Sequence, residues 1–216
     1  MPNVLKSCIA ATTLVFVSAA LVACSGENPG KPSPTTGSDA SSGASSAPAN
    51  PNVPKVSAPL TVRDSFLTEP CTVVAAADLA ALGYTDPGRP GGGASGSEGT
   101  NPSCGWSMSK QGKGNGVQVL IGSGNRERGT GGLAGFYQAK ETGRMRFVAP
   151  GPEVDGYPTV FYGLSDERAE GNCTMAVGVA DDLAIGTLAK SYQGEQDSCE
   201  TAQKLASAVI KTLKGA

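Results

Sequence analysis

The chain has 216 residues, a formal net charge of −2 and no histidine. Without histidine it cannot form a Ser-His-Asp triad, a Cys-His dyad or a histidine-ligated metal centre. The slightly acidic balance also lacks the basic footprint that nucleic acid requires, so we expect no nucleic-acid partner.

Residues 1–23 have the features of a removable signal peptide. Lys6 lies near the start, and an uncharged run of small and apolar residues extends from Cys8 to Val22. A membrane-spanning helix needs about 20 apolar residues. The shorter run therefore predicts a secretory signal rather than a transmembrane segment.

A cysteine follows this run directly. The segment Leu21-Val22-Ala23-Cys24 resembles the bacterial lipobox, in which the cysteine sulfur is diacylated and the signal is cut before it. The resemblance implies that Cys24 is the lipidated first residue of the mature protein and holds it at the extracytoplasmic face of the cell membrane. Two or more acyl chains anchor a protein stably where one does not. The alternative is a plain signal peptide with an incidental cysteine.

Residues 24–59 have the composition of a tether. Ser, Pro, Gly and Ala dominate, and no aromatic residue occurs. Such a segment cannot bury enough apolar surface to offset its ordering entropy, so we predict that it is disordered. As a flexible coil of about 35 residues it would span roughly 30–35 Å.

Residues 60–216 have the length of one domain. Hydrophobic periodicity predicts helices over residues 73–82 and 131–141 and from Ser198 to the C-terminus, with strands over residues 104–109, 116–122, 144–148, 159–163, 174–180 and 183–192. Segments 86–103 and 149–158 are rich in Gly and Pro and are predicted to be loops. Because strands and helices do not alternate strictly, we predict an α+β fold with a mostly antiparallel sheet, about three helices and two disulfides.

Individual residues predict how these elements end. Gly83 should close the first helix in a left-handed conformation, Ser198 should be the N-cap of the last helix, and Asp181-Asp182 should form a hairpin turn. The last helix has an apolar face that should pack against the core. Its residues are Ala202, Leu205, Val209, Ile210 and Leu213.

The cysteines predict disulfides. Cys8 leaves with the signal, Cys24 takes lipid, and four remain: Cys71, Cys104, Cys173 and Cys199. An even number in an exported domain indicates two bonds, which allows three pairings. We favour Cys71–Cys104 with Cys173–Cys199, which would join the opening helix to the first strand and the last hairpin to the last helix. A metal site is the alternative, but the chain has no CxxC pair and no histidine to support it, so we expect no metal.

Several short motifs occur together in this domain. They are Glu69-Pro70-Cys71, Asp78 to Gly83, Cys104-Gly105-Trp106, and Cys173 and Cys199 before an Ala-rich terminal helix. Together they resemble the actinobacterial lipoproteins of the domain-of-unknown-function 3558 family, over most of residues 68–213. Glu69 stands where members typically have Asp. The resemblance implies lipid anchoring and a small α+β domain, and it brings no catalytic residues.

The remaining chemistry rests on carboxylates and arginines. Asp166-Glu167 and Asp181-Asp182 are adjacent pairs, which in turns are usually solvated, so we expect neither a catalytic pair nor a cofactor. The segment 122–129 is rich in glycine but lacks the spacing of a phosphate-binding loop. Four arginines could form a basic patch toward anionic envelope polymers, although solvated surface charges are the simpler interpretation. They are Arg126, Arg128, Arg144 and Arg146.

Trp106, the single tryptophan, is the candidate ligand-binding residue, with a core position beside a disulfide as the alternative. We expect a non-enzymatic module that binds an envelope ligand or protein partner near Trp106 and the loops 86–103 and 149–158. A hydrolase that uses carboxylates alone and a purely structural lipoprotein are the alternatives.

Overall fold

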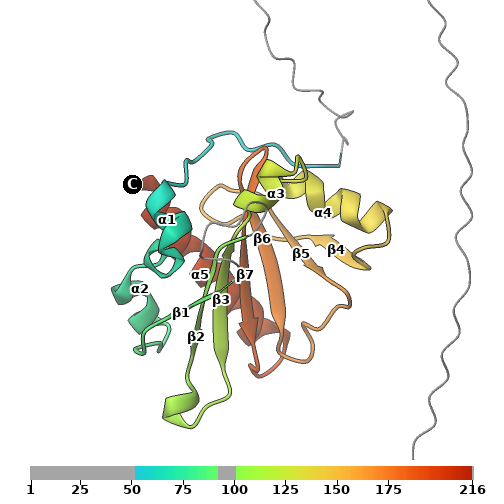
Figure 1. The fold of residues 1–216 in the computed structure, drawn as a ribbon. Helices are drawn as coiled ribbons and strands as arrows, with labels where there is room; N and C mark the ends of the chain where they lie inside the picture. Colours follow the sequence, from blue (N-terminus) through green and yellow to red (C-terminus); the bar gives the residue numbers. More distant parts are fainter. Residues whose placement is uncertain (1–51, 92–100, 216) are drawn as a thin grey trace, which may run out of the picture. The chain divides into compact units, whose positions relative to one another are not determined.

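The computed structural model describes residues 52–91 and 101–215. Cys24, the signal segment and residues 24–51 of the predicted tether lie outside the described residues. Within the described ranges the chain forms one seven-stranded antiparallel sheet with five α-helices (Figure 1). The fold is α+β, as the sequence predicts.

The strands follow one another in the sheet in the order β1-β2-β3-β7-β6-β5-β4. Their bounds are β1 Arg89–Gly91, β2 Ser103–Ser107, β3 Gly116–Ile121, β4 Phe147–Pro150, β5 Thr159–Gly163, β6 Cys173–Ala180 and β7 Leu183–Lys190. The α-helices are α1 Asp64–Thr68, α2 Ala76–Ala81, α3 Ser123–Glu127, α4 Gly132–Glu141 and α5 Glu195–Lys214, and two 3-10 turns are η1 Pro70–Val73 and η2 Ser109–Gln111.

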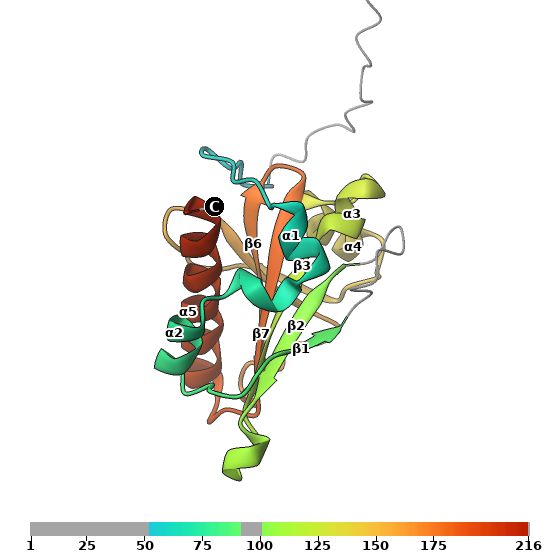
Figure 2. The ribbon, with the colours of Figure 1, turned by 60° about the vertical axis from the view of Figure 1, so that its left-hand side comes forward.

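The long helix α5 covers one face of the sheet, against β3, β6 and β7 (Figure 2). The predicted apolar face of α5 is confirmed, because its five residues are at most 4% exposed. They meet every second residue of the strands, such as Val177 and Val179 of β6 and Ile185 of β7, in the main core. Each such aliphatic side chain contributes about 1.5–3 kcal/mol by burial.

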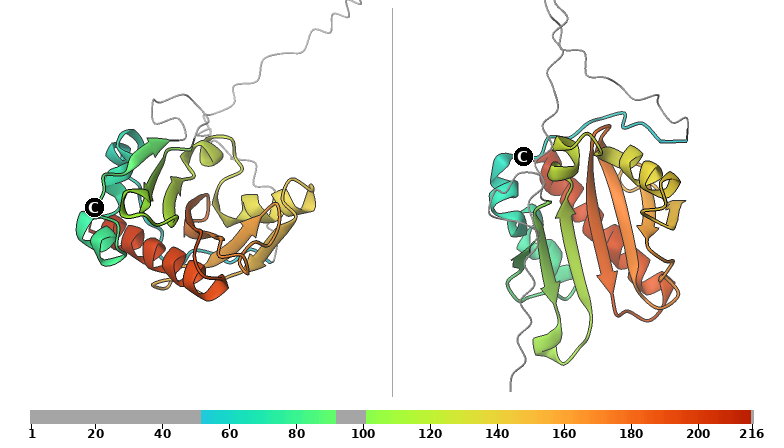
Figure 3. Two further views of the ribbon diagram at one scale, coloured as in Figure 1. Left: turned by 90° about the horizontal axis from the view of Figure 1, so that it is seen from below. Right: turned by 45° about the vertical axis from the view of Figure 1, so that its right-hand side comes forward.

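The opposite face is covered over only half its width. Helix α4 packs there over β4, β5, β6 and β7 (Figure 3). Leu133 of α4 meets a second apolar cluster that includes Val148, Val160 and Ala176. Gly178 lets the helix approach, since a Cβ at that position would lie 3.0 Å from Cγ of Leu133. Among the described residues, no helix packs on this face over β1, β2 and β3.

Two disulfides join the sheet to the helical segments, and they confirm the favoured pairing. Cys71–Cys104 connects η1 to β2, and Cys173–Cys199 connects β6 to α5. Three of the four cysteines are at most 6% exposed. Both bonds therefore lie inside the main core and hold the α5 face closed.

The first predicted helix is wrong in extent. Residues 70–82 are divided between η1 and α2 because Val74 is extended, and this break buries both Val73 and Val74. Gly83 does follow the helix in the left-handed region, at φ 86°. Helix α1 was not predicted from the sequence.

The start of α5 and two strand positions also differ from the predictions. Ser198 is not the N-cap: it lies within the helix, where its hydroxyl donates to the Gly194 carbonyl at 2.9 Å, and Gly194 at φ 85° caps the helix instead. The strand predicted over 144–148 lies at Phe147–Pro150. The predicted loop 86–103 contains β1, which pairs with β2.

Candidate functional site

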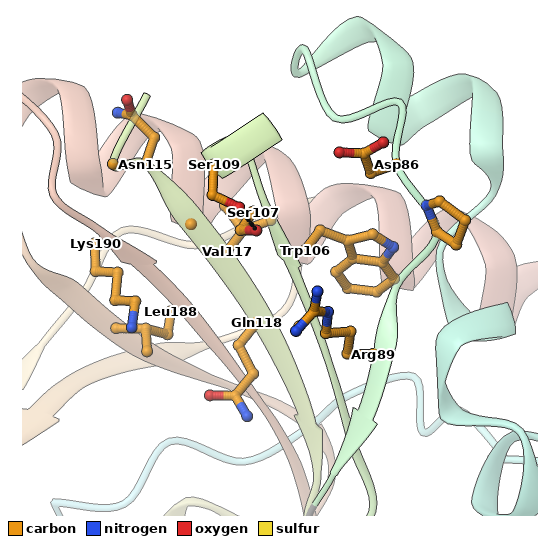
Figure 4. A pocket seen from close by; sticks show the side chains of 14 residues that line it. Asp86, Arg89, Trp106, Ser107, Ser109, Asn115, Val117, Gln118, Leu188 and Lys190 are labelled. Atoms are coloured by element: carbon orange, nitrogen blue, oxygen red, sulfur yellow. Dashed lines mark hydrogen bonds between the residues drawn. The ribbon is translucent and has the colours of Figure 1, made fainter. Parts of the chain in front are cut away.

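A pocket of about 460 Å³ opens on the half of the sheet face that α4 leaves uncovered. Residues of β1, β2, β3 and β7 line it, together with the connection between β2 and β3 (Figure 4). We call this hollow the sheet-face pocket. Its volume is within the range of small-molecule sites, about 300–1,000 Å³.

Two glycines form the floor of the sheet-face pocket. Gly105 of β2 lies opposite Arg89 on one side and Gln118 on the other. Gly116 of β3 lies opposite Ser107 and Lys190. Residues that face each other across antiparallel strands share one face of the sheet. Each row of side chains is therefore interrupted by a glycine. Gly105 leaves bare backbone in the floor, whereas Gly116 is buried beneath the Lys190 side chain.

Two cations lie on opposite sides of this floor. Arg89 is on β1 and Lys190 is at the end of β7, with Gln118 between them (Figure 4). Both side chains are exposed. Neither forms a salt bridge or hydrogen bond with any residue that the structure describes. The pocket also borders Asp86, which already has an interaction within the protein.

Neutral polar groups complete the lining. Ser107 and Ser109 are exposed, and their hydroxyls share a hydrogen bond at 3.0 Å. The Gln118 amide donates to the Ser103 hydroxyl at 3.3 Å, and Asn115 reaches the pocket from the turn before β3. These groups can exchange hydrogen bonds with hydroxyls of a ligand.

Trp106 lies at the wall of the sheet-face pocket and also in the main core. Its side chain is only 5% exposed. Gly88 covers the ring so closely that a Cβ there would lie 2.6 Å from the indole Nε1. Stacking of a ligand needs an open ring face, so the contribution of Trp106 to the pocket is restricted to an edge.

A second pocket, of about 210 Å³, lies at the other end of the sheet order, near Phe147, Tyr162 and Leu164. Leu164 is 74% exposed. Arg168 also borders it, but its guanidinium is fully engaged: it pairs with Asp166 at 2.7 Å and with Glu195 at 2.8 Å. This pocket therefore offers no unpaired charge from Arg168.

The predicted carboxylate pairs are engaged in structural contacts. Asp181-Asp182 forms the turn between β6 and β7, as predicted; Asp181 accepts the Val56 N–H at 3.0 Å and Asp182 pairs with Arg126 at 2.5 Å. The hydrogen bond from Arg168 holds the pKa of the Asp166 carboxyl below its ordinary value. In the described parts of the chain, no three His, Cys, Asp or Glu side chains are grouped so as to hold a metal ion.

The four predicted arginines are separated. Arg126 and Arg128 lie at α3, before α4, whereas Arg144 and Arg146 follow α4. A ten-residue helix is about 15 Å long, so the two pairs do not make one patch. The glycine-rich segment 122–129 is not wholly a loop, because it forms the short helix α3.

Apart from Trp106, the residues that line the sheet-face pocket were not predicted from the sequence. Gly105 and Gly116 were the features of the sequence that could have indicated the pocket, since a glycine inside a strand pattern suggests close approach of another group. Arg89 and Lys190 are distant from each other in the sequence. Only the pairing of β1, β2, β3 and β7 places them on one face of the sheet.

The fold and the pocket define a small extended-sheet domain, held by two disulfides, with an open polar pocket on one sheet face. The chain belongs to a family described as protein of unknown function (DUF3558), whose model matches residues 19–212. No curated protein and no solved structure matches it. Over residues 52–91 and 101–215, the structure has no helix with the length and apolar character needed to cross a membrane.

Proposed function

We propose that the protein is a membrane-anchored extracytoplasmic lipoprotein whose folded domain binds an envelope ligand in the sheet-face pocket and catalyses no reaction. The observation that carries the proposal is the pocket of about 460 Å³ on the uncovered half of the sheet. Its floor is bare backbone at Gly105, and its sides carry two cations that pair with none of the described residues. A domain with a purely structural role has no need of this arrangement.

The anchor is supported by the sequence around Cys24. The lipobox-like segment follows an uncharged run, and the part of the chain that matches the family begins at residue 19, so it includes Cys24. Two disulfides within the domain suit an oxidising, extracytoplasmic compartment. The composition of residues 24–59 suits a spacer between the membrane and the domain.

Binding is favoured over hydrolysis by the composition of the pocket. A glycosidase places two carboxyl groups roughly 5–9.5 Å apart across the bond that it cleaves. Among the described residues that line the sheet-face pocket, Asp86 is the one carboxylate. The pairs Asp166-Glu167 and Asp181-Asp182 lie elsewhere, where turns and arginines engage them.

The proposal is tested with a substitution in β2 that fills the sheet-face pocket and keeps the strand intact. In Gly105→Val the new side chain points into the hollow, since a Cβ there meets no atom closer than the Val117 carbonyl oxygen at 3.7 Å. Valine is favourable in strands, so thermal stability should be kept or raised. Wild type should capture a component from solubilised envelope that Gly105→Val does not capture, whereas Ala149→Val on β4 should behave as wild type. Equal capture by the wild type and a folded Gly105→Val variant would contradict the proposal.

A further inference from the structure

We infer that the ligand of the sheet-face pocket is a sugar that carries a carboxylate or phosphate group, and that this anionic group binds to a cation at one side of the pocket, Arg89 or Lys190. The inference rests on the proposed binding function and names the class of ligand. Three features of the pocket carry it: the placement of the cations, the glycine floor, and the neutral polar groups between them.

The cations are placed to meet a ligand that lies across the strands. Arg89 on β1 and Lys190 on β7 are separated by three strand spacings across the sheet and by two residues along it, which is about 16 Å between their backbones. The Lys190 stem runs over Gly116, since a Cβ at Gly116 would lie 3.4 Å from Cε of Lys190. A guanidinium and an ammonium that have no partner among the described residues retain their capacity to donate to a carboxylate or phosphate.

The described residues give no packing reason for a glycine at position 105 of the floor. Gly105 is not in the left-handed region, so its backbone conformation does not require glycine. No neighbouring atom would obstruct a Cβ there. A glycine inside a strand normally weakens it, so its presence here indicates space kept for another group. Bare backbone between polar side chains leaves room for a hydroxylated sugar ring.

The neutral lining matches hydroxyls. Ser107, Ser109, Asn115 and Gln118 offer both donors and acceptors along the pocket. An apolar ligand or a lipid surface would need exposed apolar side chains. Among the described residues the large exposed apolar side chain is Leu164, which borders the second pocket instead.

Nucleic acid is disfavoured as the source of the anionic group. Binding of a phosphate backbone requires many cations, and the chain has a formal net charge of −2. Two cations separated by a small pocket are suited to one anionic unit rather than to a continuous polyanion.

The test uses three probes that share one sugar ring: glucuronic acid, glucose 6-phosphate and glucose. Calorimetric titration of the exported mature chain should show binding of at least one anionic probe, more weakly as salt increases, and weaker or no binding of glucose. The difference between the two anionic probes identifies carboxylate or phosphate as the preferred group. In Arg89→Gln/Lys190→Gln the anionic probe should bind about tenfold more weakly or worse.

A matched control is Arg146→Gln, which removes an exposed arginine between α4 and β4, away from the pocket. It should bind the anionic probe as wild type does. The inference is overturned if glucose binds as tightly as the anionic probes, if the double variant retains wild-type affinity, or if neither anionic probe binds at millimolar concentration. If glucose binds as tightly as the anionic probes and Gly105→Val abolishes this binding, the inference about the anionic group fails but the proposed binding function stands. Unchanged envelope capture by Gly105→Val would reject both the inference and the proposed function.

Discussion

The hydroxyl groups of Tyr84 and Tyr192 lie 2.6 Å apart and share a hydrogen bond. Tyr84 precedes the segment that forms one side of the sheet-face pocket at Asp86 and Arg89, and Tyr192 follows Lys190 on the other side. The bond therefore joins the two chain segments that carry the cations. Tyr84 is 2% exposed, whereas Tyr192 is half-buried.

This difference in burial predicts unequal costs for removing either hydroxyl. Tyr192→Phe leaves the buried Tyr84 hydroxyl without its partner and should lower the free energy of unfolding by about 1–3 kcal/mol. Tyr84→Phe leaves the Tyr192 hydroxyl, which has access to water, and should cost less than about 1 kcal/mol. Urea denaturation measures both. Equal losses, or a larger loss for Tyr84→Phe, would contradict this interpretation.

Alkaline pH should destabilise the domain through its tyrosines. Burial, followed by the hydrogen bond to Tyr192, raises the pKa of Tyr84 well above its ordinary value of 10.0, and burial raises the pKa of Tyr162 to about 12. Above pH 10 the unfolded chain loses these protons while the folded chain keeps them. Stability should be fully present below about pH 10 and fall as the pH rises further.

The variant Tyr84→Phe separates the contribution of this residue. Its free energy of unfolding should decline less between pH 10 and pH 12 than that of wild type, because one of the groups that drives the decline is absent. Tyr137→Phe, in which a half-buried tyrosine on α4 is changed, serves as the control. Identical pH dependence of wild type and Tyr84→Phe would refute the assignment.

The two disulfides should contribute similarly to stability and differently to binding. Their sequence separations are 33 and 26 residues. Replacing both cysteines of either bond by alanine should cost about 3–4 kcal/mol. Cys104 directly precedes Gly105, so the Cys71→Ala/Cys104→Ala variant should also weaken ligand capture. The Cys173→Ala/Cys199→Ala variant should leave capture by the folded fraction unchanged, and equal losses of capture would contradict the location of the pocket.

Lipidation at Cys24 is tested by metabolic labelling. A palmitate analogue should label the wild type, and the protein should fractionate with membranes, because acyl chains anchor it. Cys24→Ser should lose the label and the membrane association. Cys71→Ser removes a cysteine of the folded domain and is the control that should keep the label. Labelling that persists in Cys24→Ser would disprove the anchor.

Much of the fold could be predicted from local pattern. The apolar face of α5 and the β6–β7 hairpin follow periodicities that are complete within one element, and the four domain cysteines permit few pairings. The N-terminus of α5 could not be predicted in this way, because Ser198 satisfies a carbonyl within the helix while Gly194 supplies the positive φ. Likewise β1 has three residues, one of them Pro90, and it is a strand only because β2 pairs with it.

The sheet-face pocket could not be predicted for a different reason. Its floor and sides result from the register between strands that are distant in the sequence, such as Gly105 opposite Arg89 and Gly116 opposite Lys190. Its openness results from the limited reach of α4, which covers the other half of the face. Neither property is present in any single segment. Trp106 was the candidate ligand-binding residue from the sequence because it is the single tryptophan. Its ring is almost entirely buried.

The central claim is that the sheet-face pocket is the ligand site. The most direct measurement is a titration of the ¹⁵N-labelled exported chain with solubilised envelope glycan, followed by the backbone amide resonances. The account predicts saturable shifts at Gly105, Gly116 and Lys190 that disappear in Gly105→Val. Shifts confined to the second pocket at Leu164 and Arg168, or identical shifts in the wild type and Gly105→Val, would contradict it.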